Sequence, residues 1–254
     1  MELRLLLRSG ESLLVTFGVP LGILVLFGTT EVLPTSTDDP LDFLVPGVLA
    51  VAILSTGFVA QAIQTGFERK YGVLKRLGAS PLTRPQYLAG KAAAVTVMVL
   101  AQVVVLLGVG LLLGWRPGLG PDAVVPAVLV CEPLLGCGGI GQPLLWLVPV
   151  GVVLGAAVFT ALGLALAGAL RAELVLAGSN AAYLVMIALS NLVFDLPSAA
   201  DPFVLLLPSG ALGVVLRRGL EGPGAEPTLV ALVVLVAWGL AAVGIAARTF
   251  RWEP

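Results

Sequence analysis

Residues 68–91 read ERKYGVLKRLGASPLTRPQYLAGK and join two long apolar segments, residues 43–67 and 90–114. The stretch carries six basic residues and a single acid, Glu68. Each flanking segment is long enough to cross the roughly 30 Å hydrocarbon core of a bilayer as a helix. A short basic connection between two such segments is typical of a cytoplasmic loop in a membrane protein. The stretch therefore predicts a polytopic membrane protein.

The composition of the whole chain agrees with this prediction. Of its 254 residues 58% are apolar and 11% are charged, and the mean hydropathy is +1.06. A soluble domain would carry about 25% charged and about 45–50% apolar residues. We expect an all-α fold that forms a single transmembrane domain over residues 1–254. Its six predicted transmembrane helices are residues 12–30, 43–67, 90–114, 144–170, 174–194 and 228–247.

Two segments allow another interpretation. The first apolar segment resembles the hydrophobic part of a signal peptide, but it is long and no A-x-A cleavage pattern follows it. Residues 123–135 are apolar enough to suggest a seventh span, but the stretch is short and contains Pro126 and Pro133. We therefore expect a retained first helix and an even number of spans.

The distribution of basic residues predicts that both termini are cytoplasmic. With that orientation three basic residues, Arg116, Arg217 and Arg218, lie outside, and eleven lie inside. The eleven are Arg4, Arg8, Arg69, Lys70, Lys75, Arg76, Arg84, Lys91, Arg171, Arg248 and Arg251. Short cytoplasmic loops carry an excess of Lys and Arg. We expect a multi-pass protein of the bacterial cell membrane that contacts membrane lipid.

Several functional classes lack the residues that they need. The sequence contains no His and only two Cys, which excludes the Ser-His-Asp triad and the usual zinc ligand sets. It contains no G-x-x-x-x-G-K-[ST] phosphate loop and no long basic run, so neither ATP hydrolysis on this chain nor a nucleic-acid partner is expected. Each ionisable residue falls in a loop or within about a turn of a span end, whereas ion-coupled carriers usually keep such a group inside the membrane. Uphill transport would therefore need energy from another polypeptide.

The polar residues inside the spans are uncharged. Gln61 and Gln64 lie in the second span, and Asn180, Tyr183 and Asn191 in the fifth. At 100° per residue Asn180 and Asn191 would stand about 20° apart around one helix, with Tyr183 between them. Such a stripe would suit an amphiphilic cargo. The alternative is that these amides form hydrogen bonds between helices, worth about 0.6 kcal/mol each.

Residues 68–91 also predict an elbow of two helices. Tyr71, Leu74 and Leu77 follow helical spacing, and Gly78 with Pro81 ends the pattern. Thr83, with Gln86 three residues later, forms a capping box that begins a helix running into the third span. The alternative role is a topology anchor on anionic headgroups.

The segment FERKYGVLKRLGASPLTRPQYLAGK, residues 67–91, resembles the corresponding segment in the permease subunits of type-2 ATP-binding-cassette (ABC) exporters. These export drugs, polysaccharides and lipid-linked glycans. Weaker resemblance extends to FLVPG at 43–47, RAE at 171–173 and LLPSGALGVVLRRGL at 206–220. The resemblance implies a coupling helix that docks on a separate ATP-binding subunit. The implied docking residues are Glu68, Arg69, Gly72, Leu74, Lys75, Arg76 and Leu77.

The same resemblance implies the rest of the assembly. Two copies of the ATP-binding subunit would carry ATP and Mg²⁺, with no cofactor on this chain, and a second permease subunit would complete a homo- or heterodimer. The cargo path would involve the second and fifth spans. Short outer helices would precede the sixth span, and Ser209 as N-cap with Leu212, Val215 and Leu216 on one face fits such a helix. An interfacial helix with no further role is the alternative there.

The loop 115–143 is longer than the family leads us to expect and carries Cys131 and Cys137. On an oxidising face of the membrane a disulfide between them is plausible, and two free thiols are the alternative, because a spacing of six residues does not guarantee a suitable Cα separation.

Two other functional classes make different predictions. A self-sufficient channel or secondary carrier would move its solute without a partner. An intramembrane enzyme would need paired acids and bases at one depth, and the sequence shows no such pair.

Overall fold

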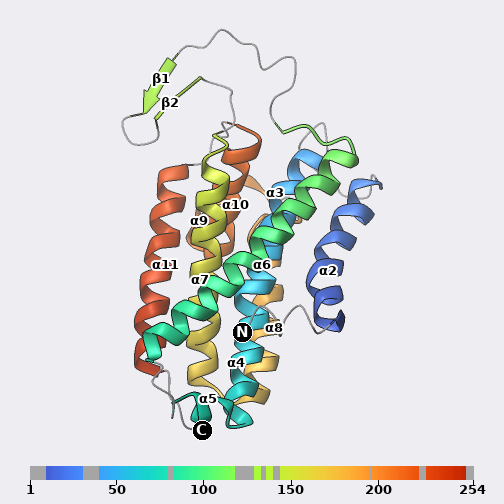
Figure 1. The fold of residues 1–254 in the computed structure, drawn as a ribbon. Coiled ribbons are helices and arrows are strands. Elements are labelled where there is room, and N and C mark those ends of the chain that lie inside the picture. The colour runs from blue at the N-terminus through green and yellow to red at the C-terminus, as the bar shows by residue number, and fades with distance from the viewer. Residues whose placement is uncertain are drawn as a thin grey trace.

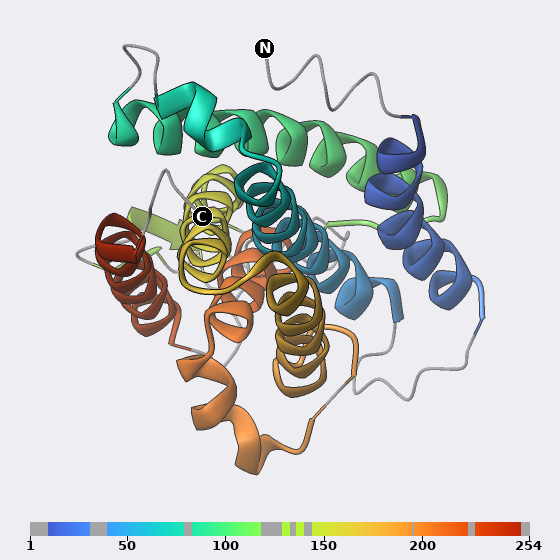
Figure 2. The same ribbon diagram turned by 90° about the horizontal axis from the view of Figure 1, so that it is seen from below.

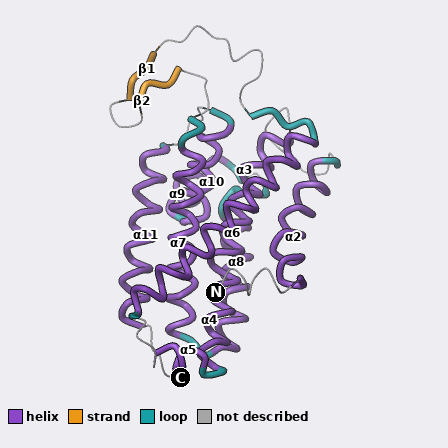
Figure 3. The backbone as a smooth tube through the Cα atoms, in the orientation of Figure 1, coloured by secondary structure: helices purple, strands orange, loops and turns teal. Residues whose placement is uncertain are grey.

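The computed structural model describes residues 10–30, 40–78, 83–117, 129–132, 136–139, 144–194, 196–222 and 227–249. Within them a bundle of helices runs between two ends (Figure 1). We call the end that carries the α4–α5 turn the elbow end, and the opposite end, where α7 begins and α10 ends, the distal end. Figure 3 shows that the described chain consists of helices joined by loops, with one small hairpin. The helices are α2 (Gly10–Gly28), α3 (Pro40–Leu54), the π-helix η1 (Ser55–Ala60), α4 (Gln61–Lys70), α5 (Val73–Gly78), α6 (Arg84–Leu112), α7 (Leu147–Ala169), α8 (Ala172–Leu189), η3 (Ser198–Ala200), α9 (Asp201–Leu206), α10 (Pro208–Leu220) and α11 (Thr228–Thr249).

Within the described residues five helical segments are long and apolar enough to cross a membrane, which confirms the predicted helical, polytopic class. They are Pro40–Lys70, Gln86–Leu112, Leu147–Ala169, Ala172–Leu189 and Thr228–Arg248. The predicted first span, residues 12–30, overlaps α2, but Phe17–Gly28 is a shorter apolar helix and is not one of these five. A sixth membrane span, formed by α2, therefore stays a prediction. In the stretch 123–135 residues Leu129–Glu132 form a strand, and the other residues lie outside the described part of the chain.

The α3–η1–α4 segment and α7 form the centre of the bundle, as the view along its axis shows (Figure 2). The first is 83% buried over its most apolar window, whereas the corresponding values are 17% for α8 and 22% for α11. Phe159, Val152 and Leu147 of α7 are fully buried in this core. The second and fourth spans are therefore the scaffold against which the other helices pack.

The π-helix η1 widens the second span where it meets α7. A Cβ atom added to Gly163 would lie 2.6 Å from the Phe58 carbonyl oxygen, and one added to Gly57 would lie 3.0 Å from the Phe159 Cβ. The two backbones can approach this closely only because both positions are glycine. On the other side of η1 the Thr56 hydroxyl donates to Gln102 Oε1 of α6 at 2.9 Å. The hydropathy of residues 43–67 predicts a helix but not this bulge.

Helix α10 precedes the last long helix, as expected, but it lies inside the bundle, and the predicted N-cap, Ser209, is wrong. Its N-cap residue is Leu207, with no side-chain cap bond. Leu212, Val215 and Leu216 are buried as expected, but so are Ala211 and Val214 on its other sides. The helix packs against α3, α7 and α11. Because glycines at 210, 213 and 219 present no side chain to neighbouring atoms, α10 fits into a space that an interfacial helix would not enter.

Glycine pairs with G-x-x-x-G spacing behave differently in two helices. In α7, Gly151 and Gly155 contact Val215 and Leu212 of α10, so they allow close packing. In α2, a Cβ atom on Gly22 would meet no atom within 4 Å. The spacing therefore marks a close helix contact in α7, whereas Gly22 of α2 makes none with the described residues.

Gly47 of α3 packs directly against the backbone of Leu192, just beyond the end of α8. We expect replacement of Gly47 by a larger residue to destabilise the fold. A Cβ atom at position 47 would lie 1.8 Å from the Leu192 carbonyl oxygen, a backbone atom that cannot move alone. Gly47→Ala should lower the free energy of unfolding of the purified protein by about 1–3 kcal/mol, the usual cost of overpacking. The control is Gly178→Ala in α8, where an added Cβ meets no atom within 4 Å. Equal stability of the two variants would contradict this packing.

The strands β1 (Leu129–Glu132) and β2 (Gly136–Gly139) form an antiparallel hairpin in which Cys131 is directly opposite Cys137. Opposed residues in such a ladder have Cα atoms about 4.5–5.5 Å apart, within the range that a disulfide spans. The bridge stays a prediction. In unreduced protein neither Cys131 nor Cys137 should react with a thiol reagent, and after reduction both should react. Labelling of both cysteines before reduction would contradict it.

Candidate functional site

The elbow is a sharp turn between α4 and α5. Helix α4 ends at Lys70, Tyr71 is its C-cap, and Gly72 has a φ of +70°. A left-handed conformation of this kind suits glycine and stops the helix. The predicted short helix is present as α5, which contains Leu74 and Leu77 and ends at Gly78 as expected. Tyr71 does not belong to it: Tyr71 is 69% exposed, whereas Leu74 is buried. The side chain of Leu77 lies outside the described part.

The return from the elbow follows the sequence prediction. Thr83 is the N-cap of α6, its side chain accepts from the backbone of the third helical residue, and its own N–H donates to Gln86 Oε1 at 3.0 Å. The predicted capping box is thus confirmed. A hydrophobic residue before an N-cap often packs on the first turns of its helix, so the sequence also predicts a contact of Leu82 with Tyr87, but Leu82 lies outside the described residues. Tyr87 instead packs with Leu74 of α5, which ties the short helix to the start of α6.

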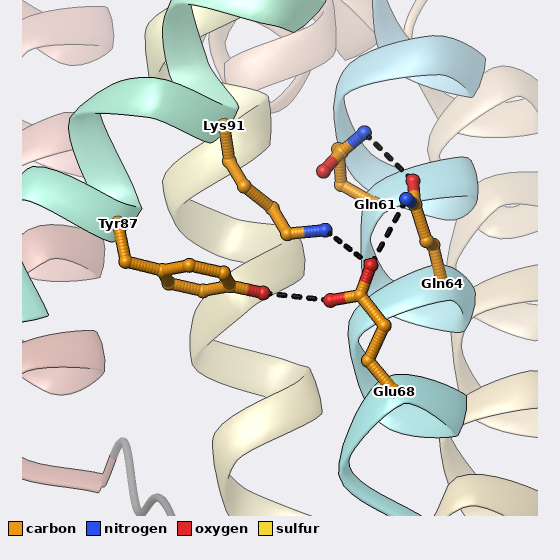
Figure 4. A network of polar contacts seen from close by, with 5 residues as sticks. All are labelled: Gln61, Gln64, Glu68, Tyr87 and Lys91. Atoms are coloured by element: carbon orange, nitrogen blue, oxygen red, sulfur yellow. Dashed lines mark hydrogen bonds and ion pairs between the residues drawn. The ribbon is translucent and has the colours of Figure 1, made fainter. Parts of the chain in front are cut away.

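Glu68 is the centre of a polar network between α4 and α6 (Figure 4). Its Oε1 accepts from Lys91 Nζ at 2.9 Å and from Gln64 Nε2 at 3.0 Å. Its Oε2 accepts from the Tyr87 hydroxyl at 2.7 Å. Gln61 Nε2 extends the chain at 3.5 Å from Gln64 Oε1. Three side chains thus donate directly to this carboxylate, and Gln61 joins the network through Gln64.

The ammonium group in this network is withdrawn from water. The Lys91 side chain is 0% exposed and that of Glu68 is 18% exposed. Lys91 Nζ also lies 5.5 Å from the centre of the Tyr87 ring, a cation–π distance. Sequence analysis placed both charges at the ends of spans, and they are at the elbow end, but they face the protein interior. Glu68 is therefore a structural residue rather than part of an exposed docking surface.

Arg69 and Lys70 attach the elbow to the turn between α7 and α8. The Arg69 guanidinium donates to the carbonyl oxygen of Gly168 at 2.9 Å and to that of Leu170. These carbonyls belong to the C-terminal end of α7, where backbone acceptors lack intrahelical partners. Lys70 Nζ pairs with Glu173 Oε1 at 2.5 Å. The RAE segment 171–173 thus lies beside the elbow, a contact that residue spacing alone could not predict.

The predicted docking residues therefore divide into two groups. Lys75 and Arg76 of α5 are exposed, whereas Leu74 is buried and Glu68 and Arg69 hold neighbouring helices. Sequence reasoning missed Tyr71 and Val73, which are 69% and 40% exposed. The exposed side chains at the elbow, which we call the elbow face, are Lys70, Tyr71, Val73, Lys75 and Arg76.

The five cargo-path candidates do not form one stripe. Gln61 and Gln64 take part in the Glu68 network. Asn180 is exposed and donates to the Leu176 carbonyl of its own helix, while Tyr183 packs against the main core. Asn191 lies beyond the end of α8 with a φ of +52°.

Asn191 stabilises a turn rather than a helix face. Its Oδ1 accepts from the Leu196 N–H at 3.1 Å, and its carbonyl oxygen accepts from Arg217. The predicted 20° alignment of Asn180 and Asn191 is therefore wrong, because the helix ends at Leu189. A polar contact within the turn takes the place of the last part of the predicted helix, residues 190–194.

These features define a class: a multi-pass helical membrane protein whose second and third spans are joined by a basic, clamped elbow. The family described as ABC-2 family transporter protein matches residues 14–248. The chain belongs to this family of type-2 ABC permeases, whose members are membrane transport subunits. No curated protein sequence matches the chain significantly.

We expect the Glu68–Lys91 pair to be the most sensitive charge pair at the elbow. Glu68→Gln should lower the free energy of unfolding by about 2–3 kcal/mol, because the buried ammonium loses its carboxylate. The double variant Glu68→Gln/Lys91→Met should recover most of that loss. The control Glu173→Gln breaks an exposed pair and should leave the unfolding midpoint nearly unchanged. If the double variant were less stable than Glu68→Gln, the loss of stability in Glu68→Gln would not come from an unpaired ammonium group at Lys91.

Proposed function

We propose that this chain is the transmembrane subunit of an ATP-driven exporter and that the elbow face docks on a separate ATP-binding subunit. The elbow end would then be cytoplasmic, both termini would lie on that side, and the membrane would be a bacterial plasma membrane. Two ATP-binding subunits and a second permease subunit, identical or related, would complete the transporter. Family membership supports the transport class, and the elbow supports the docking position.

The observation that carries this proposal is the contrast between the two sides of the elbow. On one side Lys75, Arg76 and Tyr71 are exposed, in a chain of which only 11% of the residues are charged. On the other side Glu68 and Arg69 bind α6 and the α7–α8 turn. A surface free to bind a partner is thus attached to three spans by hydrogen bonds and ion pairs.

This arrangement suits mechanical coupling. A displacement of α5 acts on α6 through Leu74, Tyr87 and Glu68, and on the α7–α8 turn through Arg69 and Lys70. Closure of ATP-bound partner subunits against the elbow face would therefore tilt several spans together and change access to the cargo path. ATP and Mg²⁺ would be bound by the partner, and the chain itself would perform no hydrolysis.

Charge reversal on the elbow face tests the docking position. Lys75→Glu/Arg76→Glu should abolish co-purification with the ATP-binding subunit encoded beside the gene, and ATP-dependent transport with it, because complementary charges are replaced by like charges. The unfolding midpoint should not change, since both side chains are solvated. The matched control is Arg248→Glu in the last turn of α11, also exposed at the elbow end.

Retention of the complex and of full transport by the Lys75→Glu/Arg76→Glu variant would refute docking at the elbow face. Equal loss in the Arg248→Glu control would show that the charge of the whole end, rather than the elbow, controls assembly.

A further inference from the structure

A pocket of about 310 Å³ lies between α9, α10 and the start of α11, away from the elbow and from the cargo-path candidates. Its lining residues are Asp201, Pro202, Val204, Leu205, Val214 and Pro227. The volume is at the lower end of the roughly 300–1,000 Å³ that small-molecule sites occupy. Five of the six lining residues are apolar, so the interior suits a hydrocarbon chain or a ring.

The burial of the lining residues shows which part of the pocket faces outward. Asp201 begins α9 and is exposed, and Pro227, directly before α11, is exposed too. Val204 and Val214 are buried. The α9–α10 turn lies farther along α11, because the Leu206 carbonyl oxygen accepts from Trp238 Nε1 at 3.0 Å, and Trp238 is about 15 Å along α11 from its first residue, Thr228, at 1.5 Å per residue. The acid therefore lies at the surface of the pocket, and the apolar wall lies inside.

Among the lining residues that the structure describes, Asp201 alone is charged. It is exposed, and the described part of the chain shows no hydrogen bond or ion pair to its side chain. A carboxylate at the rim of an apolar pocket favours a ligand whose positive group remains at the surface while its apolar part enters.

Two basic residues of α10, Arg217 and Arg218, follow Val214 by about one turn but do not line the pocket. Arg217 is held on the α3 side, where its guanidinium lies 4.5 Å from the centre of the Phe43 ring and donates to the Asn191 carbonyl oxygen. The backbone oxygen of Arg218 accepts from the Leu144 N–H. The charge that the pocket itself presents is negative.

We propose that this pocket binds a single-chain cationic amphiphile, with its ammonium group beside Asp201 and its apolar chain along Val204, Leu205 and Val214. The inference goes beyond the proposed transport function, since binding here requires neither an ATP-binding subunit nor the elbow face.

Photolabelling of the full chain tests the site. The probe is dodecyltrimethylammonium with a diazirine in its chain, applied to protein in dioleoylphosphatidylcholine nanodiscs, with labelled peptides mapped by mass spectrometry. Saturable labelling is expected in peptides that contain Asp201–Leu205, Val214 or Pro227. Val214→Trp, which fills the pocket, should remove it. Because the map of the unmodified protein is read first, the site remains testable even if Val214→Trp does not fold.

The role of the carboxylate is tested with Asp201→Asn. The concentration for half-maximal labelling by the cationic probe should rise about fivefold, as expected for a solvated charge pair, and that for a diazirine-bearing dodecanol should not change. Glu173→Gln, which makes the same charge change at the elbow end, should have no effect. Unsaturable labelling, an unchanged Asp201→Asn variant, or tighter binding of dodecyl phosphate than of the cation would each overturn the proposal.

Discussion

The Glu68 carboxylate is the point at which the second and third spans are joined at the elbow end. Lys91 is wholly buried, and an ammonium group in that position would be costly without a negative partner. Glu68 supplies this partner and also accepts hydrogen bonds from Tyr87 and Gln64. The two helices therefore meet in one register, and the connection between them must turn sharply within a few residues.

The other contacts at this end follow from that constraint. With Glu68 turned toward α6, the next residue, Arg69, faces α7 and satisfies carbonyl groups at its C-terminal end. Gly72 then reverses the chain, and Leu74 packs α5 against Tyr87. The side chains that stay exposed after these contacts form make up the elbow face, and one of them, Lys70, also pairs with Glu173. The same short stretch thus anchors the spans and presents a surface for a partner.

Hydropathy was sufficient to predict most of the spans, because about 20 apolar residues have few alternatives to a transmembrane helix. The capping box at Thr83 and Gln86 was also predictable, since it depends on residues three positions apart. The buried position of α10 was not, because its apolar face resembles that of an interfacial helix. The contact of Arg69 with Gly168 joins residues about a hundred positions apart, and a single sequence contains no signal for it.

Local chemistry also misled at two positions. Tyr71 fits the helical spacing of Leu74, but the left-handed Gly72 between them places the two side chains in different environments. Asn191 fits the spacing of Asn180, but the helix ends first, and the amide supports the turn that follows. In both cases a break in the backbone, rather than the pattern of side chains, decides which residues share a surface.

During transport the elbow and the α7–α8 turn should move as one body. Lys70→Cys and Glu173→Cys, placed at the ends of the 2.5 Å ion pair, can be joined by a short reducible bifunctional thiol reagent in protein reconstituted with its ATP-binding subunit. The cross-linked transporter should keep its ATP-dependent transport. If transport disappeared on cross-linking and returned on reduction, the two segments would have to separate during transport. The elbow and the α7–α8 turn would then not move as one body.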